Sequence, residues 1–279
     1  MMASKEKIRV DGIVLPGFKP LLQDANQRLR DIENLPMRKD DVLISSYPKS
    51  GNHWLNEIVP RLLQGTVESS HRLIYTFLEF VPDLQDLKSV PSPRVVTSHL
   101  PYRFLPKEHT QNNGKIIHII RNPKDVAVSA FHHYITDPNT KNYVPADWSV
   151  FLDEFLHGEY FYGSWFEREK EWEEAALQQP ENILVLYYED LKRNGLETLT
   201  RISSFLGLSS DPTFLQAVYD ECSFDEVQKR RKGTDDEFIF RKGSVGDWKS
   251  LFTVDQREKF DLIFEENMKD SKLKIQYSG

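Results

Sequence analysis

Four short runs of aliphatic and β-branched residues constrain the fold of this chain most strongly. They lie at 41–46, 94–98, 115–120 and 182–187. Each run is apolar at successive positions, which is typical of a strand covered on both faces by helices. Segments with helical periodicity lie between and after them, at about 52–64, 123–134, 148–156, 162–177, 196–206, 211–220 and 255–267. This alternation predicts an α/β fold: a single domain over residues 1–279, with a central parallel sheet flanked by helices.

Charge and composition exclude several classes of protein. The chain has 36 Lys and Arg against 43 Asp and Glu, a net charge of −7, so we expect no nucleic-acid partner. Its apolar runs are too short for a membrane span or a secretion signal, so we expect no membrane partner. A single cysteine, Cys222, forms no internal disulfide or Cys-based metal site. We therefore expect a cytoplasmic protein, with residues 1–10 flexible.

The loop after the first strand is the first candidate site. It contains Lys49, Ser50 and Gly51 and opens a helix. Such a turn favours phosphate binding, because free backbone N–H groups and the helix dipole face the anion and Lys49 adds a full charge. The loop is P-loop-like but is no Walker A motif, because Lys49 and Ser50 precede the only glycine. An ordinary turn with a surface lysine is the alternative.

A second strand end, followed by a helix start, lies at 120–129. Asn122 is a good N-cap for this helix. Arg121 projects from the strand's carboxyl end, where a guanidinium can bind a phosphate through two hydrogen bonds, and Ser129 can donate a hydroxyl. We expect Lys124 and Asp125 to be solvated or structural.

Two more segments are candidates for the same site. Arg241 and Lys242 precede Gly243, which favours a second phosphate contact; alone, the segment reads as a charged loop. His99 lies at the end of another strand, where a neutral imidazole can act as a general base. Alone, such a histidine is more often structural.

Together, these four segments resemble the motifs of the cytosolic sulfotransferase family, in the same order and over about residues 10–270. The family's Y-P-K-S-G-T-T-W loop is matched at Tyr47–Gly51 and Trp54, its R-N-P-K-D-V-A-V-S segment at Arg121–Ser129, its R-K-G-x-x-G-D-W-K segment at Arg241–Lys249, and the histidine of its T-H-L-P segment at His99. Four spaced motifs are far more specific than any one of them.

The resemblance implies transfer of a sulfuryl group from 3′-phosphoadenosine 5′-phosphosulfate (PAPS) to a hydroxyl or amine of a small organic acceptor, leaving the 3′,5′-diphosphate PAP. It makes His99 the general base and Lys49 the catalytic cation, and it requires no metal. The implied donor-binding residues are Lys49, Ser50, Gly51, Asn52, His53, Trp54, Arg121, Ser129, Tyr188, Ser223, Phe224, Arg241, Lys242 and Gly243.

The acceptor pocket is expected to be apolar, with one polar wall. The resemblance assigns Phe77 to it, and we add Phe18. His133 lies four residues after Ser129 and thus on the same helix face, one turn closer to the acceptor. The alternative is that His133 caps the helix or faces solvent.

Four positions depart from the family pattern. They are Asn52-His53 for Thr-Thr, Thr97 for a lysine, Cys222 for a threonine, and His133 for an aromatic residue. We expect His53 to lie near the 5′-phosphate and to strengthen donor binding on protonation near pH ~6.5. The departures leave a non-catalytic nucleotide or small-ligand binder as the main alternative. A nucleotide kinase with a degenerate loop is another, although the Walker glycines are missing.

The segment Lys249–Glu258 matches the family's short dimer motif, K-x-x-x-T-V-x-x-x-E. The resemblance implies a weak homodimer through Lys249, Thr253, Val254 and Glu258, because so small a patch makes a weak interface. The alternative is a loop followed by a helix that Thr253 caps.

Overall fold

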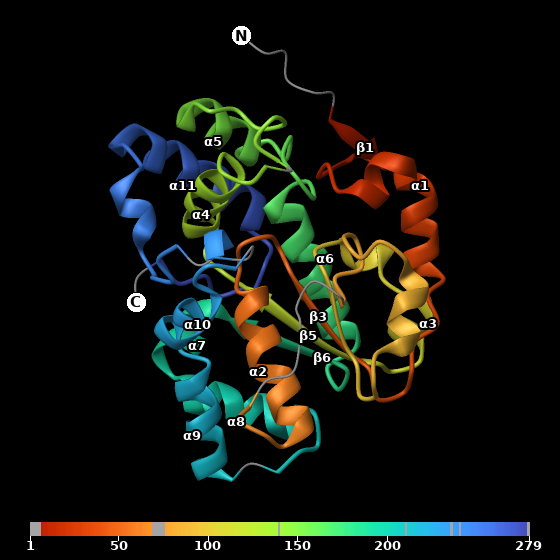
Figure 1. The fold of residues 1–279 in the computed structure, drawn as a ribbon. Helices are drawn as coiled ribbons and strands as arrows, with labels where there is room; N and C mark the ends of the chain where they lie inside the picture. The colour runs from red at the N-terminus through yellow and green to blue at the C-terminus, as the bar shows by residue number, and fades with distance from the viewer. Residues whose placement is uncertain are drawn as a thin grey trace.

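A parallel sheet of four strands forms the centre of the molecule. The structure, a computed structural model, describes residues 7–68, 76–138, 140–209, 211–234, 237–239 and 241–277. The strand order is β4-β3-β5-β6, and every neighbouring pair is parallel (Figure 1). The strands are Val42–Ser46 (β3), Val95–Ser98 (β4), Lys115–Ile120 (β5) and Ile183–Tyr187 (β6). The predicted α/β domain is confirmed, and each strand lies inside the run that predicts it.

The register of these strands brings distant parts of the chain to one edge of the sheet. Ser45 pairs with Ser98, Ser46 with Ile119, and Ile120 with Tyr187. The carboxyl ends of all four strands are therefore nearly level. The loops that follow β3, β4 and β5, which carry Lys49, His99 and Arg121, meet there; the fourth motif, at 241–249, comes after α10 (Phe224–Arg231) and lines one cavity with these three residues.

Helices cover both faces of the sheet (Figure 1). The α-helices are Lys19–Glu33 (α1), Asn52–Gln64 (α2), Lys107–Gln111 (α3), Pro123–Tyr134 (α4), Trp148–Leu156 (α5), Trp165–Gln178 (α6), Tyr188–Arg193 (α7), Gly195–Phe205 (α8), Pro212–Glu221 (α9), Phe224–Arg231 (α10) and Val254–Met268 (α11). Short 3₁₀ turns lie at Leu84–Ser89, Tyr102–Phe104, Glu237–Ile239 and Asp247–Ser250. No helix in the described ranges is long and apolar enough to cross a bilayer.

Alternate side chains of the strands enter different apolar clusters. Ile44 and Ile117 pack with residues of α2, α8 and α9, whereas Leu43 and Ile116 pack with Trp172 of α6. This two-residue period explains why both faces of the strands had to be apolar.

Two segments differ from the sequence prediction. Residues 1–10 were expected to be flexible, but Ile8–Val10 form β1, which pairs antiparallel with β2 (Ile13–Leu15); residues 1–6 lie outside the described residues. Asp11 and Gly12 between the strands have φ of 45° and 80°, the values that a tight hairpin turn requires. The helix predicted at 162–177 begins at Trp165, because Tyr162 and Gly163 also have positive φ and Ser164 is the N-cap.

The start of α11 has the helix cap that the sequence suggested. The Thr253 hydroxyl accepts from the backbone N–H of Gln256, whose side chain accepts in turn from the Thr253 N–H, so Thr253 caps the helix. Val254 beside it is 61 % exposed. The capping role is therefore present, and it leaves Val254 accessible.

Candidate functional site

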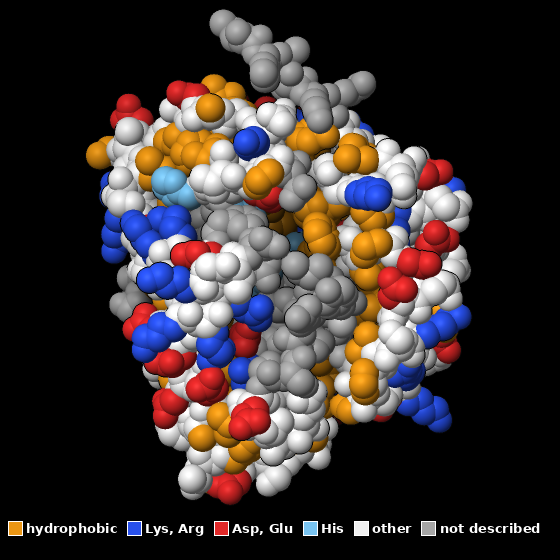
Figure 2. Space-filling view, in the orientation of Figure 1, with side chains coloured by type: hydrophobic (Ala, Val, Ile, Leu, Met, Phe, Trp, Pro, Cys, Tyr) orange, Lys and Arg blue, Asp and Glu red, His pale blue; other side chains and the backbone are white. Residues whose placement is uncertain are grey.

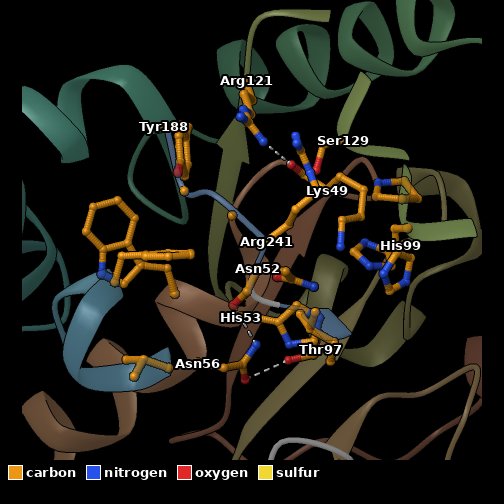
Figure 3. Close-up of a pocket in the computed structure, with 18 of the residues that line it drawn as sticks. Lys49, Asn52, His53, Asn56, Thr97, His99, Arg121, Ser129, Tyr188 and Arg241 are labelled. Carbon is orange, nitrogen blue, oxygen red and sulfur yellow. Dashed lines mark hydrogen bonds between the residues drawn. The ribbon is translucent and has the colours of Figure 1, made fainter. Parts of the chain in front are cut away.

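A cavity of about 460 Å³ opens at the carboxyl edge of the sheet. Figure 3 shows Lys49 between Arg121 and His99, with Tyr188 on the opposite side of the pocket. On the face shown in Figure 2, Lys and Arg side chains gather where α10 and the chain after it lie in Figure 1. The predicted residues that line the cavity are Phe18, Lys49, Gly51, Asn52, His53, Trp54, Phe77, His99, Arg121, Ser129, His133, Tyr188, Phe224, Arg241, Lys242 and Gly243.

The loop after β3 has the backbone shape of an anion site. Lys49 has φ of 70° and Gly51 has φ of 119°, and Gly51 is the N-cap of α2. A Cβ atom on Gly51 would lie 2.9 Å from the ring of Tyr188, so only glycine fits. The first N–H groups of α2 consequently open onto the cavity, where they favour a negative charge.

Arg121 ties this loop to the loop after α10. Its Nη1 donates to the Lys49 carbonyl at 3.0 Å, and its Nη2 donates to the Ser244 carbonyl at 2.9 Å. Its guanidinium lies 4.4 Å from the ring centroid of Tyr188. These contacts hold Arg121 in place before any ligand binds.

Asp125 and Lys124 hold the loop after α10 in place. The Asp125 carboxylate accepts from the N–H of Gly246 at 2.7 Å and from the N–H of Trp248 at 2.9 Å. Lys124 is 3 % exposed, with Nζ 4.5 Å from the Trp248 ring centroid and 2.5 Å from Asp261. Both residues are therefore structural rather than solvated.

Positive charge is concentrated around the cavity. Burial, together with Arg121 and Arg241, lowers the pKa of Lys49 to about 7. Lys242 donates to Asp247 at 2.7 Å and Arg241 also pairs with that carboxylate, whose pKa the two cations lower to about 2 against the effect of burial. A dianionic ligand would relieve the repulsion among these cations.

The ring of His99 is held in one tautomer. Its Nδ1 lies 2.8 Å from the carbonyl oxygen of Ser46. A carbonyl only accepts hydrogen bonds, so Nδ1 carries the proton and Nε2 is left as an acceptor. Burial lowers the pKa of His99 well below 6.5, and the charges of Arg168 and Lys49 lower it further. His99 is therefore neutral at pH 7, the state that a general base needs.

Aromatic rings pack against His99 within the cavity. The ring of Phe77 lies 4.9 Å from that of His99 and the ring of Tyr162 lies 5.5 Å from it, while Phe18 packs on Phe77 at 6.5 Å. His133 also lines the cavity, and burial holds its pKa well below 6.5. This end of the cavity is aromatic apart from one polar wall at His133, and it suits a flat organic ligand.

Comparison with known proteins agrees with this geometry. The model of the sulfotransferase domain matches residues 39–272. Sulfotransferase 1B1 of Mus musculus is 34 % identical over 297 aligned residues, covering 99 % of this chain and 98 % of the mouse protein. The chain belongs to the sulfotransferase family. The prediction of a sulfotransferase is thus confirmed, and the kinase alternative loses its support.

Two further relatives of this sulfotransferase extend the comparison. Sulfotransferase 1B1 of Canis lupus familiaris is 35 % identical, covering 99 % of both chains. The crystal structure of mouse sulfotransferase SULT7A1 complexed with PAP superposes with a TM-score of 0.81, at 33 % identity, over 94 % of this chain and 95 % of that chain. The agreement therefore extends through the whole fold.

Several buried polar atoms of the sulfotransferase fit a phosphate-bearing nucleotide. Both amide atoms of Asn52 and Nε of Arg121, two residues that line the cavity, are buried with no hydrogen-bond partner among the described residues. Buried polar groups normally have partners, so such a cluster indicates a ligand. At the far end, Trp54 lies 5.7 Å from Tyr188 between ring centroids, and Phe224 packs on Gly243, which suits a planar base. No group of three or more metal-binding side chains occurs in the described part of the chain.

Two of the departures from the family pattern, Thr97 and Asn52, are linked by hydrogen bonds through Asn56. Thr97 donates to Asn56 at 3.0 Å, and Asn56 donates to the carbonyl of Asn52 at 2.9 Å (Figure 3). These three residues carry no charge. Cys222 is fully buried and also lines the cavity, and burial raises the pKa of its thiol to about 12.

Three predictions need correction. Burial, followed by the charges of Lys49 and Arg231, lowers the pKa of His53 to about 3, so His53 is neutral in the free chain and is not protonated near pH 6.5. Ser50 is fully buried with its N–H bound to the Tyr47 carbonyl, and Ser223 is the N-cap that precedes α10; neither lines the cavity.

Sequence reasoning also missed residues that line the cavity. Lys192 places Nζ 5.4 Å from the Trp54 ring centroid, and Asn56, Phe80, Tyr134, Asp137 and Tyr162 contribute to the wall. Of these, only Asn56 carried a local signal, because it lies one helical turn after Asn52.

Asp125 gives a test of how the loop is held. The Asp125→Asn variant should bind PAP at least about tenfold more weakly, because the new amide N–H would face the N–H of Gly246 and leave it without an acceptor. Isothermal titration with PAP measures the effect. Asp255→Asn, on the exposed start of α11, is the control. Equal affinity of Asp125→Asn and wild type would contradict this role.

Proposed function

We propose that this sulfotransferase transfers the sulfuryl group of PAPS to the hydroxyl, or an amine, of a small organic acceptor, and leaves PAP as product. The observation that carries the proposal is the tautomer of His99: a neutral imidazole with Nε2 as acceptor, between the cation Lys49 and an aromatic pocket. The crystal structure of mouse sulfotransferase SULT7A1 with PAP, a protein 33 % identical to this chain, supports PAPS as the donor.

Different residues of the chain serve different steps of the proposed reaction. Lys49 and the first N–H groups of α2 stabilise the negative charge that grows on the leaving phosphate, while Arg121 and Ser129 hold the other phosphate. His99 Nε2 takes the proton of the acceptor hydroxyl as the oxygen attacks sulfur in line. Because these side chains supply the positive charge, we propose a reaction that requires no metal.

His99→Ala tests the base. Turnover of a simple phenol with PAPS, in buffer containing EDTA, should fall by ~10²–10⁴-fold, while PAP affinity changes little, because His99 meets the acceptor rather than the phosphates. His157→Ala, at an exposed helix end, is the matched control. Wild-type turnover in His99→Ala would remove the assignment. No turnover by the wild-type chain with phenols, alcohols or amines would favour a non-catalytic binder.

His133 tests the polar wall of the acceptor pocket. His133→Phe should raise the apparent affinity for plain apolar phenols and lower it for acceptors with a second polar group, because the substitution makes the wall wholly apolar. Steady-state KM values for matched pairs of phenols measure this. Equal effects on both acceptor classes would show that His133 does not contact the acceptor.

We also propose a weak homodimer through Lys249, Thr253, Val254 and Glu258, supported by the exposure of Val254. Sedimentation velocity at micromolar concentrations should show a concentration-dependent dimer, which Val254→Glu abolishes by placing a charge in the contact. Leu177→Glu, at an equally exposed apolar position on α6, is the control. A monomeric boundary at every concentration would reject the dimer.

A further inference from the structure

The backbone of His99 is fixed by two buried side chains of opposite charge. Glu79 Oε1 accepts from the His99 N–H at 2.6 Å, and Arg168 Nη1 donates to the His99 carbonyl at 2.8 Å. Glu79 Oε1 also accepts from the hydroxyl of Ser98 at 3.2 Å, and that hydroxyl accepts from the N–H of Leu100 at 3.0 Å. The peptide groups around His99 are therefore determined by side chains outside β4.

Glu79 is placed beside β4 by a short parallel bridge. Phe77 pairs with Thr97, and the N–H of Leu78 donates to the Thr97 carbonyl at 2.9 Å. Glu79 is fully buried, and its Oε2 has no hydrogen-bond partner among the described residues. A buried, half-satisfied carboxylate is unfavourable, and a neutral amide would supply the same acceptor. What a carboxylate adds is the strength of a charge-assisted hydrogen bond.

We propose that Glu79 is a positioning residue for the general base: its ionised carboxylate fixes the peptide of His99, and protonation of Glu79 loosens that hold and slows sulfuryl transfer. The inference rests on the proposed role of His99. It concerns the chemical step alone, because Glu79 is not among the residues that line the cavity.

The surroundings of Glu79 place its titration in the physiological range. Burial raises its pKa to about 7, against the hydrogen bonds from His99 and Ser98 and the charge of Arg168. In the described part of the chain, Arg28 and Tyr162 also interact with Glu79. Glu79 is consequently neutral below about pH 7 and ionised above it. Since the folded chain binds this proton more tightly than the unfolded chain, the stability that Glu79 contributes falls as pH rises from the ordinary glutamate pKa of 4.5 to about 7 and is then level.

A second buried glutamate provides a matched comparison. Glu189 Oε1 accepts from the N–H of Asn122 at 3.0 Å, just after Arg121, and its Oε2 is likewise buried without a partner among the described residues. Burial raises its pKa as well. Glu189 thus holds the end of the strand that carries Arg121, as Glu79 holds the end of the strand that carries His99. Replacement of Glu189 should therefore weaken donor binding rather than slow the chemical step.

The test is the pH profile of the single-turnover rate, with enzyme saturated by PAPS. The wild-type rate should rise with pH through a step near pH 7, and Glu79→Gln should lose that step and be several-fold slower above it. PAP affinity should stay within about twofold in Glu79→Gln but fall in Glu189→Gln. In thermal unfolding, Glu79→Gln should gain stability relative to wild type as pH rises from 5 to 8.

Ser98→Ala keeps the carboxylate and so tests the proposal even if Glu79→Gln does not fold. Loss of the hydroxyl donor should move the step to higher pH, because that donor favours the ionised form. An unchanged step in Glu79→Gln or in Ser98→Ala, or an equal loss of rate and PAP affinity in Glu79→Gln, would overturn the inference. Persistent turnover of His99→Ala would instead overturn the proposed function, whatever Glu79 does.

Discussion

The site depends on the register of four parallel strands. Because β3, β4, β5 and β6 end nearly level, the Lys49 loop, His99, Arg121 and Tyr188 reach one edge of the sheet without long connections. A one-residue shift would turn the apolar side chains of a strand to the opposite face and move its loop. The two apolar faces that fix this register therefore also fix the distances within the site.

Within this frame, the protein brings cations together before the ligand arrives. Hydrogen bonds to the carbonyls of Lys49 and Ser244 hold Arg121, and Asp125 holds the glycine-rich loop beside it. Burial, and then repulsion from Arg121 and Arg241, lowers the pKa of Lys49 to about 7. A bound ligand with two phosphates would offset this repulsion and favour the charged form of Lys49, which its proposed role at the leaving phosphate requires.

Local patterns predicted the strands and most of the residues that line the cavity, because their signals lie within a few residues. Examples are the apolar runs, the Asn122 cap and the Lys49–Gly51 turn. The β1–β2 hairpin was missed although Asp11-Gly12 is a hairpin signal. Glu79 and Lys192 could not be predicted, because their roles arise only when distant segments pack. His53 shows the same limit: its position was predicted, but its pKa depends on burial and on Lys49 and Arg231.

We propose above that His99 is a neutral imidazole in the reacting complex and that its Nε2 accepts the proton of the acceptor hydroxyl. Nitrogen NMR of ¹⁵N-histidine-labelled protein with PAP bound, at pH 7, tests it directly, with His99 assigned by comparison with His99→Ala. We predict a protonated Nδ1 and an unprotonated Nε2. A signal from an imidazolium, or from the tautomer protonated at Nε2, would contradict it.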